Sequence, residues 1–266
     1  MHSDKEIIEL ASNADYIFAF WSKKKDPPPK YFLLDEIGRW DKTVFIDGSE
    51  WNQTGRRTLF QKLNGNIRQS EPWINEDIFS KVKLYLKREC YPSDIERGIK
   101  PFPFAALSKY FTNNDPVKDI DVFCLFGQNK TGLRQKAEKI SNKLKKEGYN
   151  VIVGGSFPFH KYLDLTARSL ISIDAWGGGD CNARRWEIHA NKSCAFVQKY
   201  NITIPNDFTN GVNVVEFTSA SELEEKLRYY LRNKDELVSI GKRGYDHLIK
   251  YHIPEKRIDY IFANLK

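Results

Sequence analysis

Short apolar runs alternate with helix-like segments along the second half of the chain. The run DVFCLFG (residues 121–127) ends in glycine, which is typical of a buried parallel strand. A helix pattern follows, with Lys and Arg on one face and Gly148 as its C-cap. The apolar face of this helix holds Leu133, Ala137, Ile140 and Leu144. YNVIVGG (residues 149–155) then predicts a second strand, so the segment forms one strand–helix–strand unit.

The alternation continues toward the C-terminus. We expect one helix around residues 160–169 and another from about residue 182. Ser219 and Glu222 form a capping box that predicts the start of a later helix. Strands are expected at LISIDAW (170–176), SCAFVQ (193–198) and VNVVEF (212–217). Repeated β–α units of this kind predict a parallel, doubly wound sheet covered by helices.

The first half of the chain is less regular. Its strand candidates are DYIFAF (15–20), KTVFIDG (42–48) and KVKLYLKRE (81–89), separated by proline-rich and polar segments. A connector with three prolines, residues 98–116, follows them. We therefore predict two α/β lobes with a cleft between them, divided near residues 113–118. The N-terminal lobe takes residues 1–117 and the C-terminal lobe takes residues 118–266.

Several classes of protein are disfavoured by the sequence. There is no apolar stretch of the roughly 20 residues that a transmembrane helix needs, and the first residues lack the pattern of a signal peptide. We therefore expect the protein in the cytoplasm. The four cysteines form no C-x-x-C pair and the histidines form no metal-binding motif, so we predict structural thiols and no metal site. The net charge of +7 favours acidic partners such as nucleotides, anionic lipid headgroups, nucleic acid or charged glycans, but it is too diffuse to choose among them.

The segment GGGDCNARRWE (residues 177–187) contains the candidate chemistry. Gly177, Gly178 and Gly179 follow an expected strand, where a doubly wound sheet binds its ligands. Bare amides before a helix, together with Arg184 and Arg185, would bind phosphate oxygens, and Glu187 would accept hydrogen bonds from two ribose hydroxyls. By spacing alone, a simple chain reversal with an Arg–Glu surface pair is an equal alternative.

The segment YLDLTARSLISIDAWGGGDCNARRWEIHANKSCAFVQ resembles the donor-site region of glycosyltransferases with the GT-B fold, in their group-1, spore-maturation-protein-like branch. The C-terminal sequence DFTNGVNVVEFTSASELEEKLRYYLRNKDELVSIGKRGYDHLIKYHIPEKRIDYIF follows the same family order, and VFIDGSEWN and LYLKRECYPSDIERGIKPFPFA extend the likeness to most of the chain from Lys42 onward. The resemblance implies two Rossmann-like lobes with parallel sheets, the N-terminal one short, and a C-terminal helix that crosses back to the first lobe.

The resemblance also assigns donor-site residues. It matches Glu187 to the glutamate that holds the ribose, and the three glycines to a loop near the phosphates or the transferred sugar. Gly127 and Arg134 match positions that face the diphosphate, while a solvated helix residue is a nearly equal interpretation of Arg134. The resemblance implies a base pocket near Gly154, Gly155 and Tyr162, although a tyrosine beside such a turn is also common packing. Ala190-Asn191-Lys192 departs from the family's A-x-G at the end of the glutamate helix.

The implied reaction is transfer of a hexose or pentose from a nucleotide sugar, UDP- or GDP-linked, to an acceptor hydroxyl. GT-B transferases usually stabilise the leaving diphosphate with helix N-termini and basic side chains, so the resemblance implies metal-independent transfer without a further cofactor. An inverting enzyme needs a general base. Asp47, at the end of an expected strand, is the first candidate and Glu50 the second, while an Asx-turn is an equally good interpretation of Asp47.

The sequence leaves the acceptor open among a glycan, a lipid-linked glycan, a protein and modified DNA. A second subunit could complete the short N-terminal lobe, so a homo-oligomer also stays open. The alternatives are a noncatalytic nucleotide- or nucleic-acid-binding α/β protein and a glycosyltransferase that acts on modified DNA bases. At the C-terminus, residues 251–266 have apolar residues at helical spacing, so one helix face must pack against the protein. The resemblance implies that this helix crosses back and joins the two lobes, and the alternative is a helix that covers the sheet of its own lobe.

Overall fold

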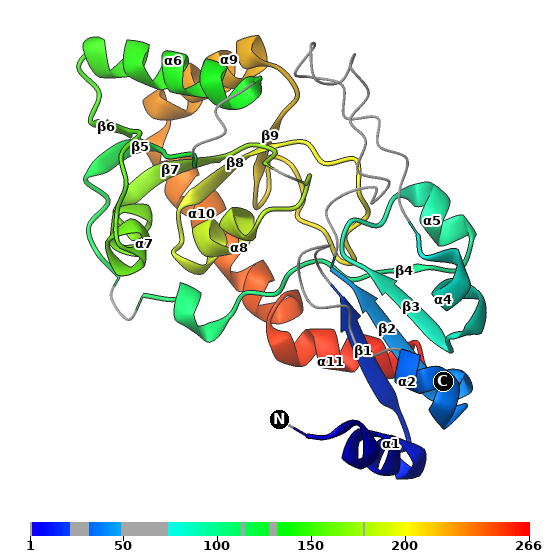
Figure 1. Cartoon of the computed structure of the whole chain (residues 1–266). Coiled ribbons are helices and arrows are strands. Elements are labelled where there is room, and N and C mark those ends of the chain that lie inside the picture. The colour runs from blue at the N-terminus through cyan, green and yellow to red at the C-terminus, as the bar shows by residue number, and fades with distance from the viewer. Residues whose placement is uncertain (1, 22–31, 49–73, 113–114, 128–131, 178) are drawn as a thin grey trace.

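The computed structural model describes residues 2–21, 32–48, 74–112, 115–127, 132–177 and 179–266. It contains two parallel sheets, one of four strands and one of five. We call the part of the chain built on the four-stranded sheet the N-terminal lobe, and the part built on the five-stranded sheet the C-terminal lobe (Figure 1). Two facing α/β lobes confirm the predicted fold class.

The N-terminal lobe has strand order β1-β2-β3-β4, with all neighbours parallel. The strands are β1 (Ile17–Trp21), β2 (Thr43–Asp47), β3 (Leu84–Lys87) and β4 (Lys100–Pro101). Its helices are α1 (Asp4–Asn13), α2 (Phe32–Ile37), α4 (Glu76–Lys81) and α5 (Pro92–Glu96), with a 3-10 turn at Trp40–Lys42. The three strands expected from the sequence are confirmed. The two-residue β4 is too short to leave a period-2 pattern.

The C-terminal lobe has strand order β6-β5-β7-β8-β9, again all parallel. The strands are β5 (Ile120–Cys124), β6 (Val151–Val153), β7 (Ser169–Asp174), β8 (Cys194–Gln198) and β9 (Val215–Phe217). Its helices are α6 (Leu133–Lys146), α7 (Phe159–Ala167), α8 (Ala183–Ala190), α9 (Ala220–Arg232) and α10 (Lys234–Tyr251). The 3-10 turn at Ser108–Tyr110 lies on the connector between the lobes.

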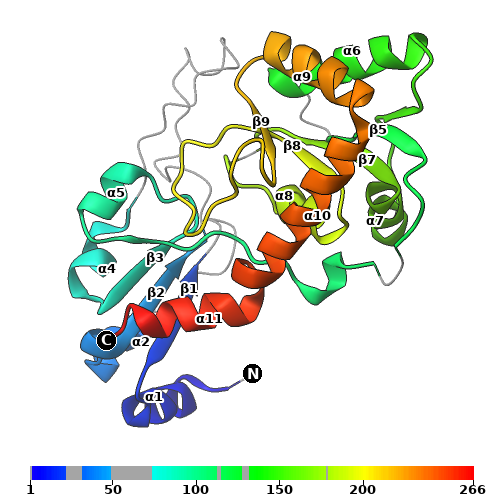
Figure 2. The same cartoon turned by 180° about the vertical axis from the view of Figure 1, so that it is seen from behind.

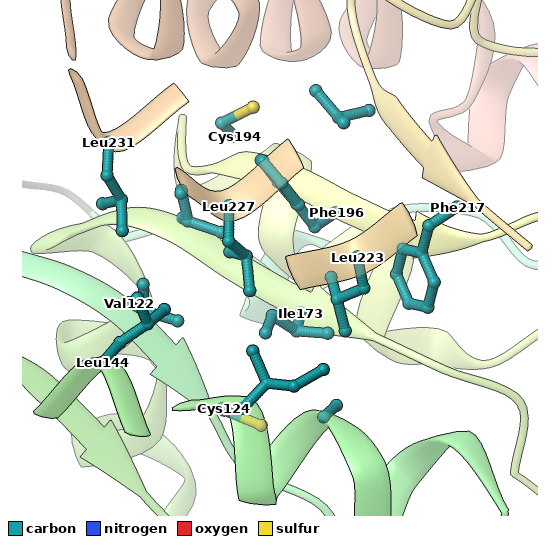
Figure 3. Packing of buried hydrophobic residues seen from close by; sticks show 14 of the residues in the cluster. Val122, Cys124, Leu144, Ile173, Cys194, Phe196, Phe217, Leu223, Leu227 and Leu231 are labelled. Atoms are coloured by element: carbon teal, nitrogen blue, oxygen red, sulfur yellow. The ribbon is translucent and has the colours of Figure 1, made fainter. Parts of the chain in front are cut away.

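Helices cover both faces of the five-stranded sheet. In Figure 1, α6 and α9 lie on one side of it, and α7 and α8 lie on the other. The packing under α9 is shown in Figure 3, where Leu223, Leu227 and Leu231 point toward the sheet strands. Each of these leucines is almost fully buried, and such burial contributes about 1.5–3 kcal/mol per side chain. The 3.6-residue spacing in the sequence therefore produces this layer.

The C-terminal helix α11 (Pro254–Ala263) returns to the N-terminal lobe. Figure 2 shows it against the four-stranded sheet, with the C-terminus near α2. Ile261 and Leu265 pack with Val44, Leu84 and Leu86 of that sheet, so the crossing helix predicted from the sequence is confirmed.

A bonded junction joins α11 to the connector between the lobes. The Arg257 guanidinium donates to the carbonyl oxygens of Pro103 (3.2 Å) and Phe104 (3.0 Å). The backbone N–H of Ala106 donates to the carbonyl of His252 (2.8 Å). The two places where the chain passes between the lobes are thus hydrogen-bonded to each other.

Candidate active site

The glycine loop, which we define as residues 175–182 between β7 and α8, lies at the carboxyl edge of the C-terminal sheet. Its first glycine, Gly177, is packed so closely that a methyl group there would lie 2.5 Å from an Arg134 nitrogen and 2.6 Å from the Asn182 side-chain oxygen. Arg134 donates two hydrogen bonds, of 3.2 and 3.0 Å, to the carbonyl of Ala175. The Asn182 amide also donates to this carbonyl, at 3.1 Å. A side chain at position 177 would therefore have to displace the Arg134 guanidinium and the Asn182 amide. Gly178 lies outside the described residues.

Two guanidinium groups lie over one aromatic ring beside this loop. The Cζ atoms of Arg134 and Arg184 are 5.2 and 5.5 Å from the ring centroid of Phe126, which follows β5. Arg184 is also 5.4 Å from the ring of Tyr162. Both arginines are half-buried, so the strand edge combines positive charge with access to solvent. Such an arrangement suits an anionic ligand.

Glu187 lies one turn further along α8. Its Oε2 accepts a hydrogen bond of 2.9 Å from the hydroxyl of Tyr162, which α7 provides. Burial raises the pKa of Glu187 above its ordinary value, while the Tyr162 hydrogen bond and the charge of Arg184 act in the opposite direction. Burial also raises the pKa of the Tyr162 hydroxyl, which therefore stays a neutral hydrogen-bond donor. The structure thus brings Arg134 of α6 and Tyr162 of α7 together with Arg184 and Glu187 of α8.

Arg185 is positioned differently from its neighbour in the sequence. It is 1% exposed and donates a 2.6 Å hydrogen bond to a carboxylate oxygen of Asp207. Its guanidinium also lies 4.8 and 4.9 Å from the rings of Tyr200 and Phe208. Consecutive helix residues point about 100° apart, so Arg184 reaches the strand edge while Arg185 enters the interior. Its geometry does not support the predicted phosphate contact.

The predicted glycines lie at strand ends. Gly127 is exposed after β5, and no atom of the described residues lies within 4 Å of the place where its Cβ would be. After β6, Gly154 and Gly155 have φ values of 68° and 98°, in the left-handed region that favours glycine. The N–H of Gly154 donates to the carbonyl of Cys124 at 3.0 Å, which holds this turn against β5.

The predicted general base has partners inside the protein. Asp47, at the end of β2, is fully buried and accepts hydrogen bonds from the Tyr85 hydroxyl (2.9 Å) and the Lys87 ammonium (3.2 Å). A carboxylate in this environment stabilises the β2–β3 pair, and the geometry does not place it in reach of an acceptor. Glu50 lies outside the described residues.

Two residues at strand ends were missed by the sequence analysis. Asp174, the last residue of β7, is fully buried and accepts a 2.8 Å hydrogen bond from the Tyr200 hydroxyl. Burial raises its pKa, with Arg184 as the strongest opposing charge. Glu89 follows β3 and accepts hydrogen bonds from the backbone N–H groups of Asp180 and Cys181 in the other lobe. The strand-end position of Asp174 was a usable signal, whereas the partners of Glu89 are more than 90 residues away.

Two observations concern classes of site. Among the residues that the structure describes, no group of three or more His, Cys, Asp or Glu side chains is placed to hold a metal ion. Within the same residues, no helix has both the length and the apolar character needed to cross a membrane.

Two parallel-sheet lobes joined by a returning C-terminal helix are the architecture of the GT-B fold. The model of the glycosyl transferase-like family matches residues 117–263, and the chain belongs to this family. No curated protein matches the chain.

Solved structures share the fold at low identity. An alpha-glucosyltransferase in complex with UDP-glucose and DNA containing an abasic site is 10% identical with a TM-score of 0.58, covering 98% of this chain and 83% of that chain. A glycosyltransferase from Rickettsia africae ESF-5 is 11% identical with a TM-score of 0.58, covering 99% and 79%. Sucrose-phosphate synthase from Thermosynechococcus elongatus is 10% identical with a TM-score of 0.53, covering 98% and 77%.

Proposed function

We propose that the protein transfers a sugar from a nucleotide sugar to an acceptor hydroxyl, with the donor bound at the carboxyl edge of the C-terminal sheet. One observation carries this proposal: Glu187, Tyr162, Arg184 and Arg134 converge beside the glycine loop in a member of a glycosyl transferase-like family. In a nucleotide sugar, a ribose diol lies next to a diphosphate. A carboxylate can accept hydrogen bonds from the diol, and two adjacent guanidinium groups can bind the diphosphate.

Each group has a role in this proposal. Glu187, oriented by Tyr162, accepts hydrogen bonds from the ribose hydroxyls. Arg134 and Arg184 face the diphosphate, and Gly127 lets a phosphate approach the backbone. The nucleobase lies toward Gly154 and Gly155, where the partly exposed Phe159 ring stacks on Tyr162 at a centroid distance of 6.0 Å.

The chemical step needs a stabilised diphosphate leaving group. Preorganised positive charge lowers the energy of that developing charge, and removal of one such contact typically costs about 10²–10³ in rate. We propose that Arg134 and Arg184 supply this charge and that no metal ion is required. UDP sugars are the first donors to test, because the similar alpha-glucosyltransferase was solved with UDP-glucose. Testing UDP-hexoses beside UDP-pentoses decides which kind of sugar the protein transfers.

The N-terminal lobe is the proposed acceptor side, and Asp47 has a structural role there instead of acting as the base. Modified DNA is the acceptor class that we propose to test first, because the similar glucosyltransferase was solved with DNA and a net charge of +7 is compatible with a polyanion. Duplex binding that weakens steeply with added salt would support it, because phosphate contacts release counterions. Binding without salt dependence would direct the search to glycans or proteins.

A panel of nucleotides and nucleotide sugars tests the donor proposal. We expect one nucleoside diphosphate and its sugars to raise the melting temperature by several degrees, since a ligand at about 100 times its Kd stabilises by ~2.7 kcal/mol. Slow hydrolysis of the same donor should accompany the shift. Glu187→Gln should remove both effects, while Glu224→Gln on the outer helix α9 should retain them. If no nucleotide raises the melting temperature of the wild-type protein, the donor site is refuted.

A further inference from the structure

Glu89 carries a carboxylate from the N-terminal lobe into the glycine loop of the C-terminal lobe. Its Oε2 accepts a hydrogen bond from the N–H of Asp180 and its Oε1 one from the N–H of Cys181, each 3.1 Å long. Glu89 is 4% exposed, although it follows a strand of the other lobe. Both oxygens of one side chain are thus bonded to consecutive backbone amides across the lobe interface.

The loop has space for this carboxylate only because residue 179 is glycine. A methyl group at Gly179 would overlap the Glu89 carboxylate. The backbone at Gly179 does not lie in the left-handed region, so glycine is needed there for the close approach alone. The position of Gly179 in the loop and that of Glu89 after β3 are therefore matched.

The loop is also held from the C-terminal lobe. Arg134 donates to the carbonyl of Ala175, and the N–H of Trp176 donates to the side-chain oxygen of Gln198 at 3.1 Å. These contacts fix the first half of the loop within its own lobe. Glu89 fixes the second half, immediately before α8, from the opposite lobe.

Burying this carboxylate has a cost that the contacts offset. Desolvation raises the pKa of Glu89, while the two backbone hydrogen bonds and the charge of the neighbouring Arg88 oppose the rise. The amides that compensate for this cost belong to the other lobe. The Glu89 carboxylate is therefore hydrogen-bonded to them when the lobes are arranged as here, and hydrated by water when the lobes are apart. The contact therefore favours one shape of the loop together with one arrangement of the lobes.

We propose that Glu89 is a positioning residue: it sets the backbone of the glycine loop from the N-terminal lobe, so that the loop has its reactive shape only when the lobes are together. This inference rests on the proposed function for its effect on transfer. The nucleotide contacts of Glu187 and Arg184 lie within the C-terminal lobe and do not need Glu89. The transferred sugar and the leaving phosphate lie next to the glycine loop, so their positions depend on the loop shape that Glu89 sets.

Hydrogen exchange tests the contact without any substrate. In Glu89→Ala, peptides that contain residues 180 and 181 should exchange about tenfold faster or more, as expected when charged hydrogen bonds to these amides are lost. Peptides from α6 and α9 should be unchanged. Glu224→Gln should leave the 180–181 peptide at its wild-type rate. If Glu89→Ala leaves that rate unchanged, the inference is overturned whether or not the protein transfers sugars.

Donor hydrolysis tests the effect on the reaction. Glu89→Ala should lower kcat about 10- to 100-fold with less than about a threefold change in the donor KM, because misplacing a reacting group costs rate more than binding. Glu89→Gln should give a smaller loss, since its amide oxygen can still accept from one N–H. An unchanged kcat, or a loss confined to KM, overturns the inference. A merely structural role would lower the melting temperature and leave the rate per folded molecule intact.

Gly179→Ala supplies the matched second variant. Alone, it should lower kcat about tenfold, because its methyl group displaces the Glu89 carboxylate. In the Glu89→Ala background it should cause no further loss, since the obstacle is gone. Equal effects of Gly179→Ala in both backgrounds would overturn the inference. If the wild-type protein hydrolyses no nucleotide sugar while exchange at residues 180–181 rises in Glu89→Ala, the proposed function fails and the loop contact stands.

Discussion

The two lobes hold a pair of charged side chains near the carboxyl edge of the sheet in different ways. In the N-terminal lobe, Asp47 and Lys87 end neighbouring strands, are almost fully buried and form an ion pair with N–O distance 3.2 Å. In the C-terminal lobe, Arg134 and Arg184 stay half-buried beside the glycine loop. A closed pair stabilises a sheet, whereas partly solvated positive charge is available to a ligand. The comparison teaches that charge near a sheet edge stabilises the fold where it is paired and buried, and that half-buried charge is where we propose ligand binding.

The largest expected effect is a loss of stability from the N-terminal lobe. Lys87→Ala removes the positive partner of a fully buried carboxylate, which costs about 3–5 kcal/mol of unfolding free energy. Urea denaturation monitored by circular dichroism measures this cost. Lys83→Ala, an exposed lysine just before the same strand, should change the free energy by less than about 0.5 kcal/mol. Equal effects of the two variants would remove the stability side of the comparison.

A comparable effect on catalysis should come from the C-terminal lobe. Arg184→Ala should lower the rate of donor hydrolysis about 10²–10³-fold, because it removes positive charge that we propose faces the leaving diphosphate. Its melting temperature should stay near that of the wild type, since the guanidinium is half-buried. Arg232→Ala, on the outer helix α9, is the matched control and should retain the wild-type rate. An Arg184→Ala variant that unfolds early but keeps its rate per folded molecule would reverse the assignment.

A smaller effect is expected at the first glycine of the loop. Gly177→Ala places a methyl group against Arg134 and Asn182, and such overpacking typically costs about 1–3 kcal/mol. The donor KM should rise as Arg134 is displaced. Gly127→Ala, where the added methyl meets no atom of the described residues, should leave the melting temperature unchanged. Thermal denaturation measures the melting temperatures of the two variants, one at a crowded glycine and one at an open glycine. Equal melting temperatures would contradict the packing described for Gly177.

The pH dependence of donor binding gives the smallest expected change. Glu187 must be ionised to accept two ribose hydrogen bonds, and burial raises its pKa above 4.5. Donor affinity should therefore be complete above the raised pKa and be lost as the pH falls through it. Tyr162→Phe removes a hydrogen bond that lowers this pKa, so the loss should begin at a higher pH. Titrations of donor affinity between pH 4 and 8 would contradict this role if both proteins gave the same profile.

The sequence predicted the C-terminal lobe better than the N-terminal lobe for a physical reason. Leu223, Leu227 and Leu231 repeat at helical spacing because one helix face packs on one sheet, so a local pattern records the fold. The strand-end glycines and Glu187 are equally local. In contrast, β4 is two residues long and pairs only with β3, which leaves no period to detect.

The site residues that the sequence did not assign correctly also depend on contacts that no local pattern records. Arg184 and Arg185 are adjacent and chemically identical, and only the position of Asp207 and of the aromatic rings separates an edge arginine from a buried one. Asp47 was predicted as a general base from its place at a strand end. Its pairing with Lys87, 40 residues away on another strand, could not be predicted from the sequence. Contacts between distant segments depend on the tertiary arrangement, which composition and spacing do not contain.

Isothermal titration of the donor nucleoside diphosphate into the wild type and Glu187→Ala tests the central claim most directly, namely that the C-terminal strand edge is the donor site. We expect one site per chain in the wild type. In Glu187→Ala we expect an affinity weaker by ~1.5–3 kcal/mol, as for a lost charged hydrogen bond. The same affinity in both proteins, with an unchanged melting temperature, would contradict the account.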